Sequence, residues 1–169
     1  DPSYFWTKDR WEGLQKLKQK EILNRSKKTF QNTLPESYEI DQKFGTVGAV
    51  ALDKAGNITA GTSTGGITNK KYGRIGDAPI IGAGTYANSQ VGISAPGRGE
   101  YFIRATAART IAAKMEYQDK DLKTATQETI DEIEKMGGDG GLIALDKDGN
   151  LAMPFNTAGM YRGAITDSG

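Results

Sequence analysis

Two residue types that often carry proton transfer and covalent catalysis are missing, because the chain of 169 residues contains no histidine and no cysteine. The lack of histidine excludes Ser-His-Asp and Cys-His nucleophile systems, and every histidine-based zinc site, from this segment. The lack of cysteine excludes disulfides and thiolate chemistry, and indicates nothing about the compartment. Proton transfer here therefore requires a carboxylate, a lysine, a tyrosine or an amine.

An excess of charge and long apolar runs are missing as well. The 22 Lys and Arg residues nearly balance the 21 Asp and Glu residues, which leaves a formal net charge of +1. Binding to nucleic acid or to an anionic membrane requires a basic surface that this balance does not provide. The apolar stretches end well before the roughly 20 residues of a membrane span. We therefore expect neither nucleic acid nor a membrane among the partners.

The chain begins DPSYFWTK, with no initiator Met and no signal-like segment, so we expect a processed or incomplete chain. Residues 8–23 carry apolar side chains at helical spacing, with Lys and Glu between them, which predicts an amphipathic helix with a core-packing face. Residues 24–43 are polar, without a sustained period, and are typical of a surface loop or linker that ends at Gly45. The apolar residues of the predicted helix are Trp11, Leu14, Leu17 and Leu23.

An internal repeat organises the rest of the chain. GAVALDKAGNITAGTST (48–64) and GLIALDKDGNLAMPFNT (141–157) share one layout, in which an apolar run is followed by Asp-Lys, a Gly-Asn turn and a second run. Because Gly and Asn tolerate the positive φ angles of tight turns, each copy predicts a β-hairpin.

The segment between the two hairpins predicts helices and further strands. Residues 100–117 and 122–136 have helical periodicity, and 80–84 and 91–94 are strand-like runs. This order is typical of an α+β fold with helices covering a sheet. The nearly continuous apolar runs VGAVAL and GLIAL favour a sheet buried on both faces.

Thr46 stands just before the first predicted strand and matches Asp139 in the register of the repeat, so the strand itself does not require a threonine there. A threonine hydroxyl is a poor nucleophile unless a base takes its proton, and without histidine the base can be the residue's own α-amino group, with a reference pKa of about 8. That amine exists only if the chain is cut after Gly45. An ordinary strand threonine is the alternative interpretation.

Five ordered motifs resemble the plant-type asparaginase and isoaspartyl peptidase family of N-terminal nucleophile hydrolases. They are GTVGAVALD, TSTGG, GRIGDAPIIGAGTYA, GEYFIRATAA and GGLIALDKDGNLAMPFNTAGMYRG. The resemblance implies a four-layer α-β-β-α sandwich and a precursor that cuts itself between Gly45 and Thr46. Residues 1–45 would then be the end of an α subunit, and 46–169 a β subunit that carries the nucleophile. Pairs of α and β subunits would assemble as a dimer, giving a heterotetramer.

The same resemblance implies an amidohydrolase acting on isoaspartyl dipeptides and L-asparagine through a Thr46 acyl-enzyme, with no cofactor in this segment. A structural sodium site is expected in the α-subunit segment missing from this chain. Thr64 would hydrogen-bond the nucleophile, and Gly97 would supply an oxyanion N–H. Arg74 and Asp77 would bind the substrate's α-carboxylate and α-ammonium groups, and Gly99 would line the pocket.

Simpler interpretations exist for each of these residues. Thr64 could pair with Thr46 only as part of a sheet, and Thr157 matches Thr64 in the register of the repeat. Arg74 and Asp77 lie in a glycine-bounded loop that we do not expect to bury them, and they could pair with each other at the surface. The APGRGE stretch that contains Gly97 and Gly99 could be only a turn.

One position departs from the family pattern. Pro96 stands where the family usually has a threonine whose hydroxyl is the second oxyanion donor, and proline has neither a hydroxyl nor a backbone N–H. We therefore expect weak asparaginase turnover or a shifted substrate preference, unless Arg98 or a water replaces the donor. The alternatives are a glycosylasparaginase-like hydrolase, a protease relative, and a non-catalytic binding homologue with an impaired oxyanion hole.

Overall fold

The computed structural model describes residues 1–27 and 45–166. The chain forms two compact units, Asp1–Lys43 with Gly66–Arg74, and Phe44–Gly65 with Ile75–Gly169. Most of the linker predicted at 24–43 lies outside the described residues.

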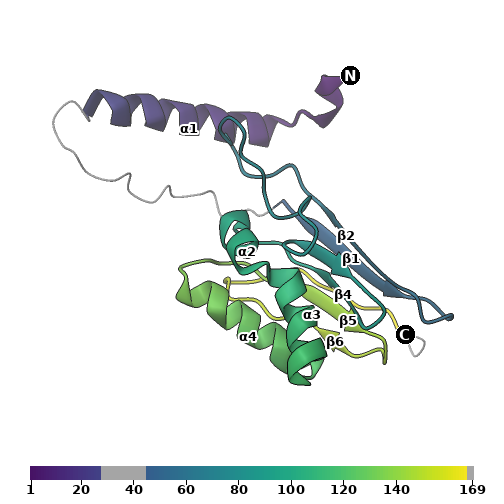
Figure 1. The fold of residues 1–169 in the computed structure, drawn as a ribbon. Coiled ribbons are helices and arrows are strands. Elements are labelled where there is room, and N and C mark those ends of the chain that lie inside the picture. The colour runs from purple at the N-terminus through teal and green to yellow at the C-terminus, as the bar shows by residue number, and fades with distance from the viewer. Residues whose placement is uncertain (28–44, 167–169) are drawn as a thin grey trace. The chain divides into compact units, whose positions relative to one another are not determined.

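The first unit is built on one long helix. A single 3-10 turn, η1 (Pro2–Phe5), precedes α1 (Lys8–Lys27), so the predicted helix is confirmed and runs four residues further than expected (Figure 1). The predicted core-packing face is not found in the described chain, because Trp11 and Leu23 are 48% and 59% exposed. The side chain of Glu21 instead accepts hydrogen bonds from Asn69 and Lys71, at 3.0 and 2.9 Å, and so holds the segment Gly66–Arg74.

The second unit begins with the first predicted hairpin. β1 (Val47–Leu52) and β2 (Ile58–Ser63) are antiparallel. The Asp53 carboxylate closes the turn by accepting hydrogen bonds from the backbone and side-chain N–H groups of Asn57, at 2.8 and 2.7 Å. Gly56 has a φ of +85°, a conformation that suits glycine. The repeat therefore predicted this hairpin correctly.

The second hairpin belongs to a four-stranded antiparallel sheet with the order β3-β4-β5-β6. The predicted strand at 80–84 is wrong, because those residues form turns around Gly82, whose φ is +90°. Their only bridge pairs Ile81 with Thr85, the first residue of β3. The strands are β3 (Thr85–Ala87), β4 (Val91–Ser94), β5 (Ile143–Asp146) and β6 (Leu151–Ala152).

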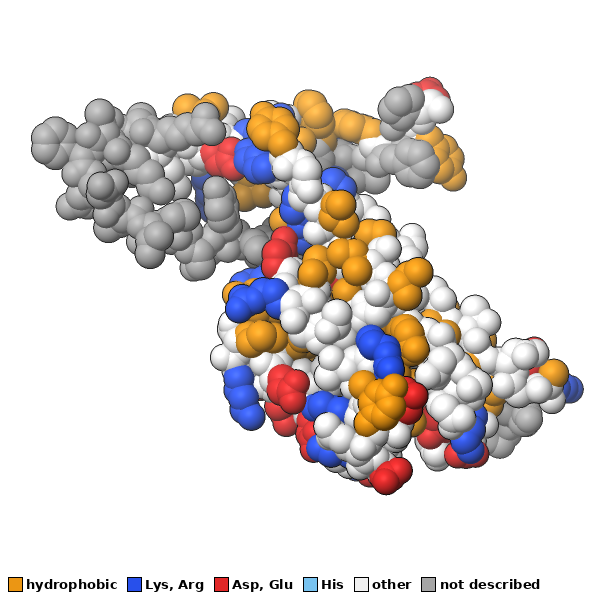
Figure 2. Space-filling model, in the orientation of Figure 1, with side chains coloured by type: hydrophobic (Ala, Val, Ile, Leu, Met, Phe, Trp, Pro, Cys, Tyr) orange, Lys and Arg blue, Asp and Glu red, His pale blue; other side chains and the backbone are white. Residues whose placement is uncertain are grey.

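Three helices follow β4, where the sequence predicted two. They are α2 (Gly99–Ala105), α3 (Ala107–Gln118) and α4 (Leu122–Lys135). The helix predicted at 100–117 is broken at Thr106, which adopts a left-handed conformation with φ 45° and caps α2. Over α3 and α4, acidic and basic side chains are mixed on the surface (Figure 2).

The hairpin and the helices cover opposite faces of the four-stranded sheet. Gly92 points toward the hairpin, since a Cβ there would stand 2.7 Å from Ile58 Cγ2. Successive strand residues alternate between faces, so Val91 and Ile93 point the other way. Both are fully buried in one core cluster with helix residues that include Phe102. The architecture is α+β, as the sequence predicted.

Only one of the two apolar runs is buried as expected. In β5, Ala144 is fully buried and Leu145 is 8% exposed. In β1 the residues at alternate positions, Val47, Ala49 and Ala51, are exposed in the described chain. The prediction of burial on both faces is therefore wrong for β1, because nothing in the described part of this unit covers its outer face. No described helix is both long enough and apolar enough to cross a membrane.

Candidate active site

Thr46 and Thr64 form a hydrogen-bonded pair at the open end of the first hairpin. The β1–β2 register places Val47 opposite Ser63, so the next positions outward bring Thr46 and Thr64 together. The Thr46 hydroxyl donates a hydrogen bond to the Thr64 hydroxyl over 2.9 Å. Thr46 is half-buried, whereas Thr64 and Gly45 are exposed. The peptide bond between Gly45 and Thr46 therefore lies next to a second hydroxyl and within reach of water.

The two threonines face the four-stranded sheet. Strand side chains alternate, so Thr46 shares a face of the hairpin with Gly48, and Thr64 shares it with Thr62. A Cβ at Gly48 would stand 2.8 Å from Ser94 Cβ, and the Thr62 and Ser94 hydroxyls are 2.5 Å apart. The threonine pair therefore lies on the face of the hairpin that packs against the sheet. Along the hairpin it is two residues beyond Gly48 and Thr62, which contact Ser94.

A cluster of hydroxyls that the sequence analysis did not single out lies beneath this pair. Thr62, Ser94 and Thr85 come from three strands, and Thr85 Oγ1 donates to Thr62 Oγ1 over 2.5 Å. Thr62 also donates to the Gly84 carbonyl at 3.2 Å. The alternation of Thr62 and Thr64 in the sequence was a signal that both share one face, but the partners on other strands are set only by the fold.

The loop that carries Gly97 lies at the same end of the stacked sheets. Along β4, Gly92 lies against Ile58 at the start of β2, and Ser94 lies against Gly48 near the start of β1. Beyond Ser94 in the same direction, β4 is followed by Pro96 and Gly97, and the hairpin ends in the threonine pair. Residues predicted from separate motifs are thus gathered at one edge.

Gly97 is held by a short extension of the β4–β5 pairing. It forms an antiparallel bridge with Gly140, made by hydrogen bonds from Arg98 N–H to the Asp139 carbonyl and from Gly141 N–H to the Pro96 carbonyl, each 2.9 Å. In such a pair the two central residues turn their own N–H groups away from each other. Within the described part of the chain, the Gly97 N–H donates no hydrogen bond.

Close packing requires glycine at 97 and at 99. A Cβ at Gly97 would stand 2.2 Å from the Phe102 ring. A Cβ at Gly99, the first residue of α2, would stand 3.0 Å from Asp77 Oδ1. The structure therefore brings Gly99 and Asp77 close together, and the role of Gly99 in lining a pocket stays a prediction.

Asp77 and Arg74 have different surroundings. Asp77 is only 7% exposed, so the expectation that its loop leaves it unburied is wrong. Its carbonyl accepts hydrogen bonds from Ile80 N–H and Gly84 N–H, at 2.9 and 3.1 Å, which fold the loop around it. Arg74 ends the segment that belongs to the first unit, and its role in substrate binding stays a prediction.

The second hairpin does not repeat the threonine pair. Thr157, which matches Thr64 in the repeat, donates its hydroxyl hydrogen bond to the Gly159 carbonyl at 3.0 Å. Asp139, which matches Thr46, forms an ion pair with Arg98 at 3.1 Å. The chemistry that distinguishes the two copies is therefore concentrated in the first. Among residues 1–27 and 45–166 no cluster of three or more acidic side chains is arranged to hold a metal ion.

Fold and site together define an α+β protein with a hydrogen-bonded threonine pair at its candidate site. A family model described as asparaginase matches residues 1–169. The chain belongs to this asparaginase family.

Proteins from two bacteria and from a mammal are similar in sequence to the chain. The chain is 57% identical over 123 residues to an isoaspartyl peptidase of Escherichia coli and 55% identical over 123 residues to one of Salmonella typhimurium, with 72% of the chain covered in both. It is 39% identical over 153 residues, 87% of the chain, to an isoaspartyl peptidase/L-asparaginase of Mus musculus. The matches span 38%, 39% and 47% of the lengths of these three proteins, so the chain corresponds to less than half of each.

Proposed function

We propose that the protein is a self-cleaving amidohydrolase that hydrolyses isoaspartyl dipeptides and L-asparagine through Thr46. The observation that carries the proposal is the 2.9 Å hydrogen bond from the Thr46 hydroxyl to the Thr64 hydroxyl, next to the exposed Gly45. The names of the relatives support the substrate class, since they are called isoaspartyl peptidases or isoaspartyl peptidase/L-asparaginase.

The first reaction is cleavage of the chain itself. The Thr46 hydroxyl oxygen attacks the Gly45 carbonyl carbon, and the acyl group shifts from the Thr46 nitrogen to its oxygen as an ester. Water then hydrolyses this ester, which leaves a carboxylate on Gly45 and a free α-amino group on Thr46. Thr64 accepts a hydrogen bond from the attacking hydroxyl and so orients it before the amine exists.

The second reaction uses the new amine as a base with a reference pKa of about 8. The amine takes the hydroxyl proton while the oxygen attacks the side-chain amide carbon of the substrate, and the proton then passes to the leaving nitrogen. Water hydrolyses the resulting acyl-enzyme to release aspartate. In this scheme the Gly97 N–H stabilises the oxyanion.

Substrate recognition in this proposal uses one acidic and one basic side chain. We assign the substrate's ammonium group to the Asp77 carboxylate and its α-carboxylate to the Arg74 guanidinium, which is suited to a carboxylate by its two parallel donors. Gly99 leaves room beside Asp77 because it lacks a Cβ.

We also propose how the cleaved chain assembles. Residues 1–45 and 46–169 would become parts of an α and a β subunit, and two α/β pairs would form a dimer. A further helical layer over the exposed face of β1 would complete a four-layer α-β-β-α sandwich of the N-terminal nucleophile type. No step of the chemistry at Thr46 passes through the sodium ion expected in the α segment.

The test is to express the full gene product, incubate it at neutral pH, and record intact masses with N-terminal sequencing of every fragment. A fragment that begins TVGAV is expected, together with hydrolysis of β-aspartyl dipeptides and L-asparagine. The Thr46→Ala variant is expected to remain uncleaved and inactive, whereas Thr46→Ser retains a hydroxyl and cleaves.

Two results would redirect the proposal. A chain that remains whole under these conditions supports the non-catalytic binding homologue, with Pro96 as the suspected cause. A cleaved protein that hydrolyses glycosylated asparagine but not β-aspartyl dipeptides supports the glycosylasparaginase-like alternative.

A further inference from the structure

Besides the Gly141–Pro96 backbone hydrogen bond, the residue pair Arg98 and Asp139 joins the loop that presents Gly97 to the segment that leads into the second hairpin. Their backbones are joined by the Arg98 N–H, which donates to the Asp139 carbonyl over 2.9 Å. Their side chains also meet, with Arg98 Nε 3.1 Å from Asp139 Oδ1. Residue 98 is therefore held against Asp139 by its backbone and by its side chain.

The Arg98 guanidinium is held by a third contact. It lies 5.9 Å from the centroid of the Tyr101 ring, and that ring in turn packs against Gly138, where a Cβ would stand 2.6 Å from it. Arg98 is therefore committed to Asp139 and Tyr101. This arrangement argues against Arg98 as the replacement donor for the hydroxyl that Pro96 lacks.

The Arg98–Asp139 pair is next to Gly97, and the direction of the Gly97 N–H follows from the strand geometry. Ala95 donates its N–H to the Gly84 carbonyl at 2.8 Å, on the β3 side of β4, and backbone groups two residues apart in an extended strand point to the same side. The Gly97 N–H therefore points to that side too, away from β5. With proline at 96, it is the backbone donor on which the proposed oxyanion site depends.

We propose that Arg98 and Asp139 are positioning residues that hold the Gly97 N–H in place at the edge of the sheets where the Thr46 hydroxyl lies. This inference rests on the proposed function. Oδ1 of Asp139 is buried and has no hydrogen bond in the described chain, so the Arg98 charge is its counterpart. Loss of either charge leaves the other without its partner, and the backbone hydrogen bonds alone then hold residue 98. A displacement of about 1 Å at an oxyanion donor is enough to slow the reaction strongly.

The test compares kcat and KM for a β-aspartyl dipeptide in the full-length processed protein and in four variants. Asp139→Asn and Arg98→Met are expected to lower kcat by at least about tenfold, with KM within about twofold, because substrate binding does not use the donor. Arg98→Lys keeps the charge and is expected to recover most of the lost kcat.

The fourth variant, Glu116→Gln, is the matched control. It removes the Arg109–Glu116 ion pair, whose 3.0 Å separation and 34% and 44% side-chain exposures resemble the 3.1 Å, 34% and 35% of the Arg98–Asp139 pair. Its kcat is expected to remain that of the parent protein.

Several outcomes would overturn the inference. Unchanged kcat in Asp139→Asn and Arg98→Met, an equal loss in Glu116→Gln, or a rise in KM that accounts for the whole effect each contradicts a positioning role. If Asp139→Asn does not fold, the comparison of Arg98→Met with Arg98→Lys decides, and equal kcat values overturn it. A parent protein that neither cleaves itself nor hydrolyses the dipeptide refutes the proposed function, and the inference falls with it.

Discussion

Gly48 lies directly against Ser94, so closely that a Cβ atom at position 48 would stand 2.1 Å from the Ser94 hydroxyl oxygen. The contact joins the first hairpin to the four-stranded sheet two residues from Thr46. Because Ser94 also contacts Thr62 through its hydroxyl, the separation of the two sheets at this point is set by small and polar groups. The candidate site therefore lies beside a close contact between the two sheets.

Substitution of Gly48 by alanine is expected to destabilise the protein by about 1–3 kcal/mol, since the added methyl group must displace Ser94 and separate the sheets. Chemical denaturation of the parent and the variant measures this difference. Gly61→Ala is the control, because a Cβ at Gly61 meets nothing within 4 Å. Equal stability losses in the two variants would contradict the packing argument.

Removal of the Thr64 hydroxyl tests its role beside the nucleophile. Thr64→Val keeps the shape of the side chain but cannot accept the hydrogen bond from Thr46, so we expect kcat to fall by about 100-fold. Thr64→Ser retains the hydroxyl and is expected to retain most of the activity. Thr157→Val removes the corresponding hydroxyl of the second hairpin, which bonds Gly159, and is expected to change little. Similar rates for Thr64→Val and the parent would mean that the threonine pair only supports the sheet.

Pro96 offers a gain-of-function test. Its carbonyl accepts a hydrogen bond from Gly141 N–H at 2.9 Å, and any residue at 96 can keep that contact. Pro96→Thr adds a hydroxyl next to Gly97 and is expected to raise kcat/KM by about tenfold or more, if one oxyanion donor contributes as in other hydrolases. Pro96→Val has the shape of threonine without the hydroxyl, and its rate is expected to match the parent. An unchanged kcat/KM for Pro96→Thr would contradict the hypothesis that the protein has lost an oxyanion hydrogen-bond donor.

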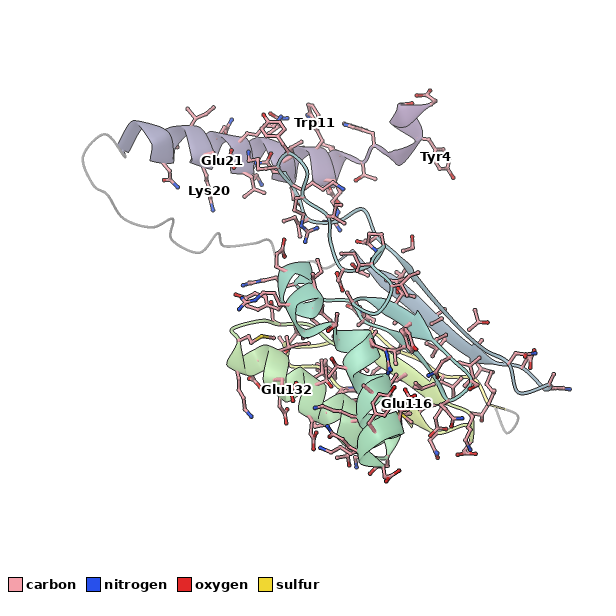
Figure 3. The ribbon with its side chains drawn as sticks, in the orientation of Figure 1. Tyr4, Trp11, Lys20, Glu21, Glu116 and Glu132 are labelled. Atoms are coloured by element: carbon pink, nitrogen blue, oxygen red, sulfur yellow. The ribbon has the colours of Figure 1, made fainter. Side chains whose placement is uncertain are left out.

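A charged network joins α3 to α4 away from the candidate site. The Lys114 side chain is only 8% exposed, and its ammonium group lies 3.1 Å from the Glu128 carboxylate and 2.9 Å from that of Glu132. Both glutamates belong to α4, on which Figure 3 labels Glu132. Burial opposes the charge on Lys114, but the hydrogen bonds that its ammonium group donates to Glu132 and Glu128 outweigh this effect and raise the pKa of the lysine. Hydrogen bonds from Lys120 and Lys114 lower the pKa of Glu128.

These shifts predict how stability depends on pH. Because the folded-state pKa of Glu128 lies below its ordinary value of 4.5, its contribution is fully present above that pH and is lost as the pH falls through the lower, folded-state pKa. We expect Glu128→Gln to have a lower Tm than the parent at neutral pH and a smaller loss of Tm in acid. Thermal melts from about pH 3 to 7 measure both curves. Parallel curves for the two proteins would show that Glu128 does not contribute in this way.

Local sequence determined several elements because their causes are local. The Asp53 and Gly56 turn and its repeat at 146–150 specify two hairpins, and the helical periodicity of 122–136 specifies α4. Local pattern did not reveal the break at Thr106, because a threonine with positive φ is stabilised by the packing of the two helices that it joins and not by its own preference. The turns at 80–84 were missed for a similar reason, since Asp77 organises them through the Ile80 and Gly84 N–H groups.

The sequence by itself determined that any proton transfer in this segment uses something other than histidine, and it singled out Thr46, Thr64 and the glycines at 97 and 99. Only the tertiary structure decided that Asp77 is buried against Gly99 and that Arg98 pairs with Asp139 across 41 positions of the chain. Residue types and spacing report on chemistry and on local backbone shape. Contacts between distant segments depend on how sheets and helices pack, and that packing is a property of the whole core.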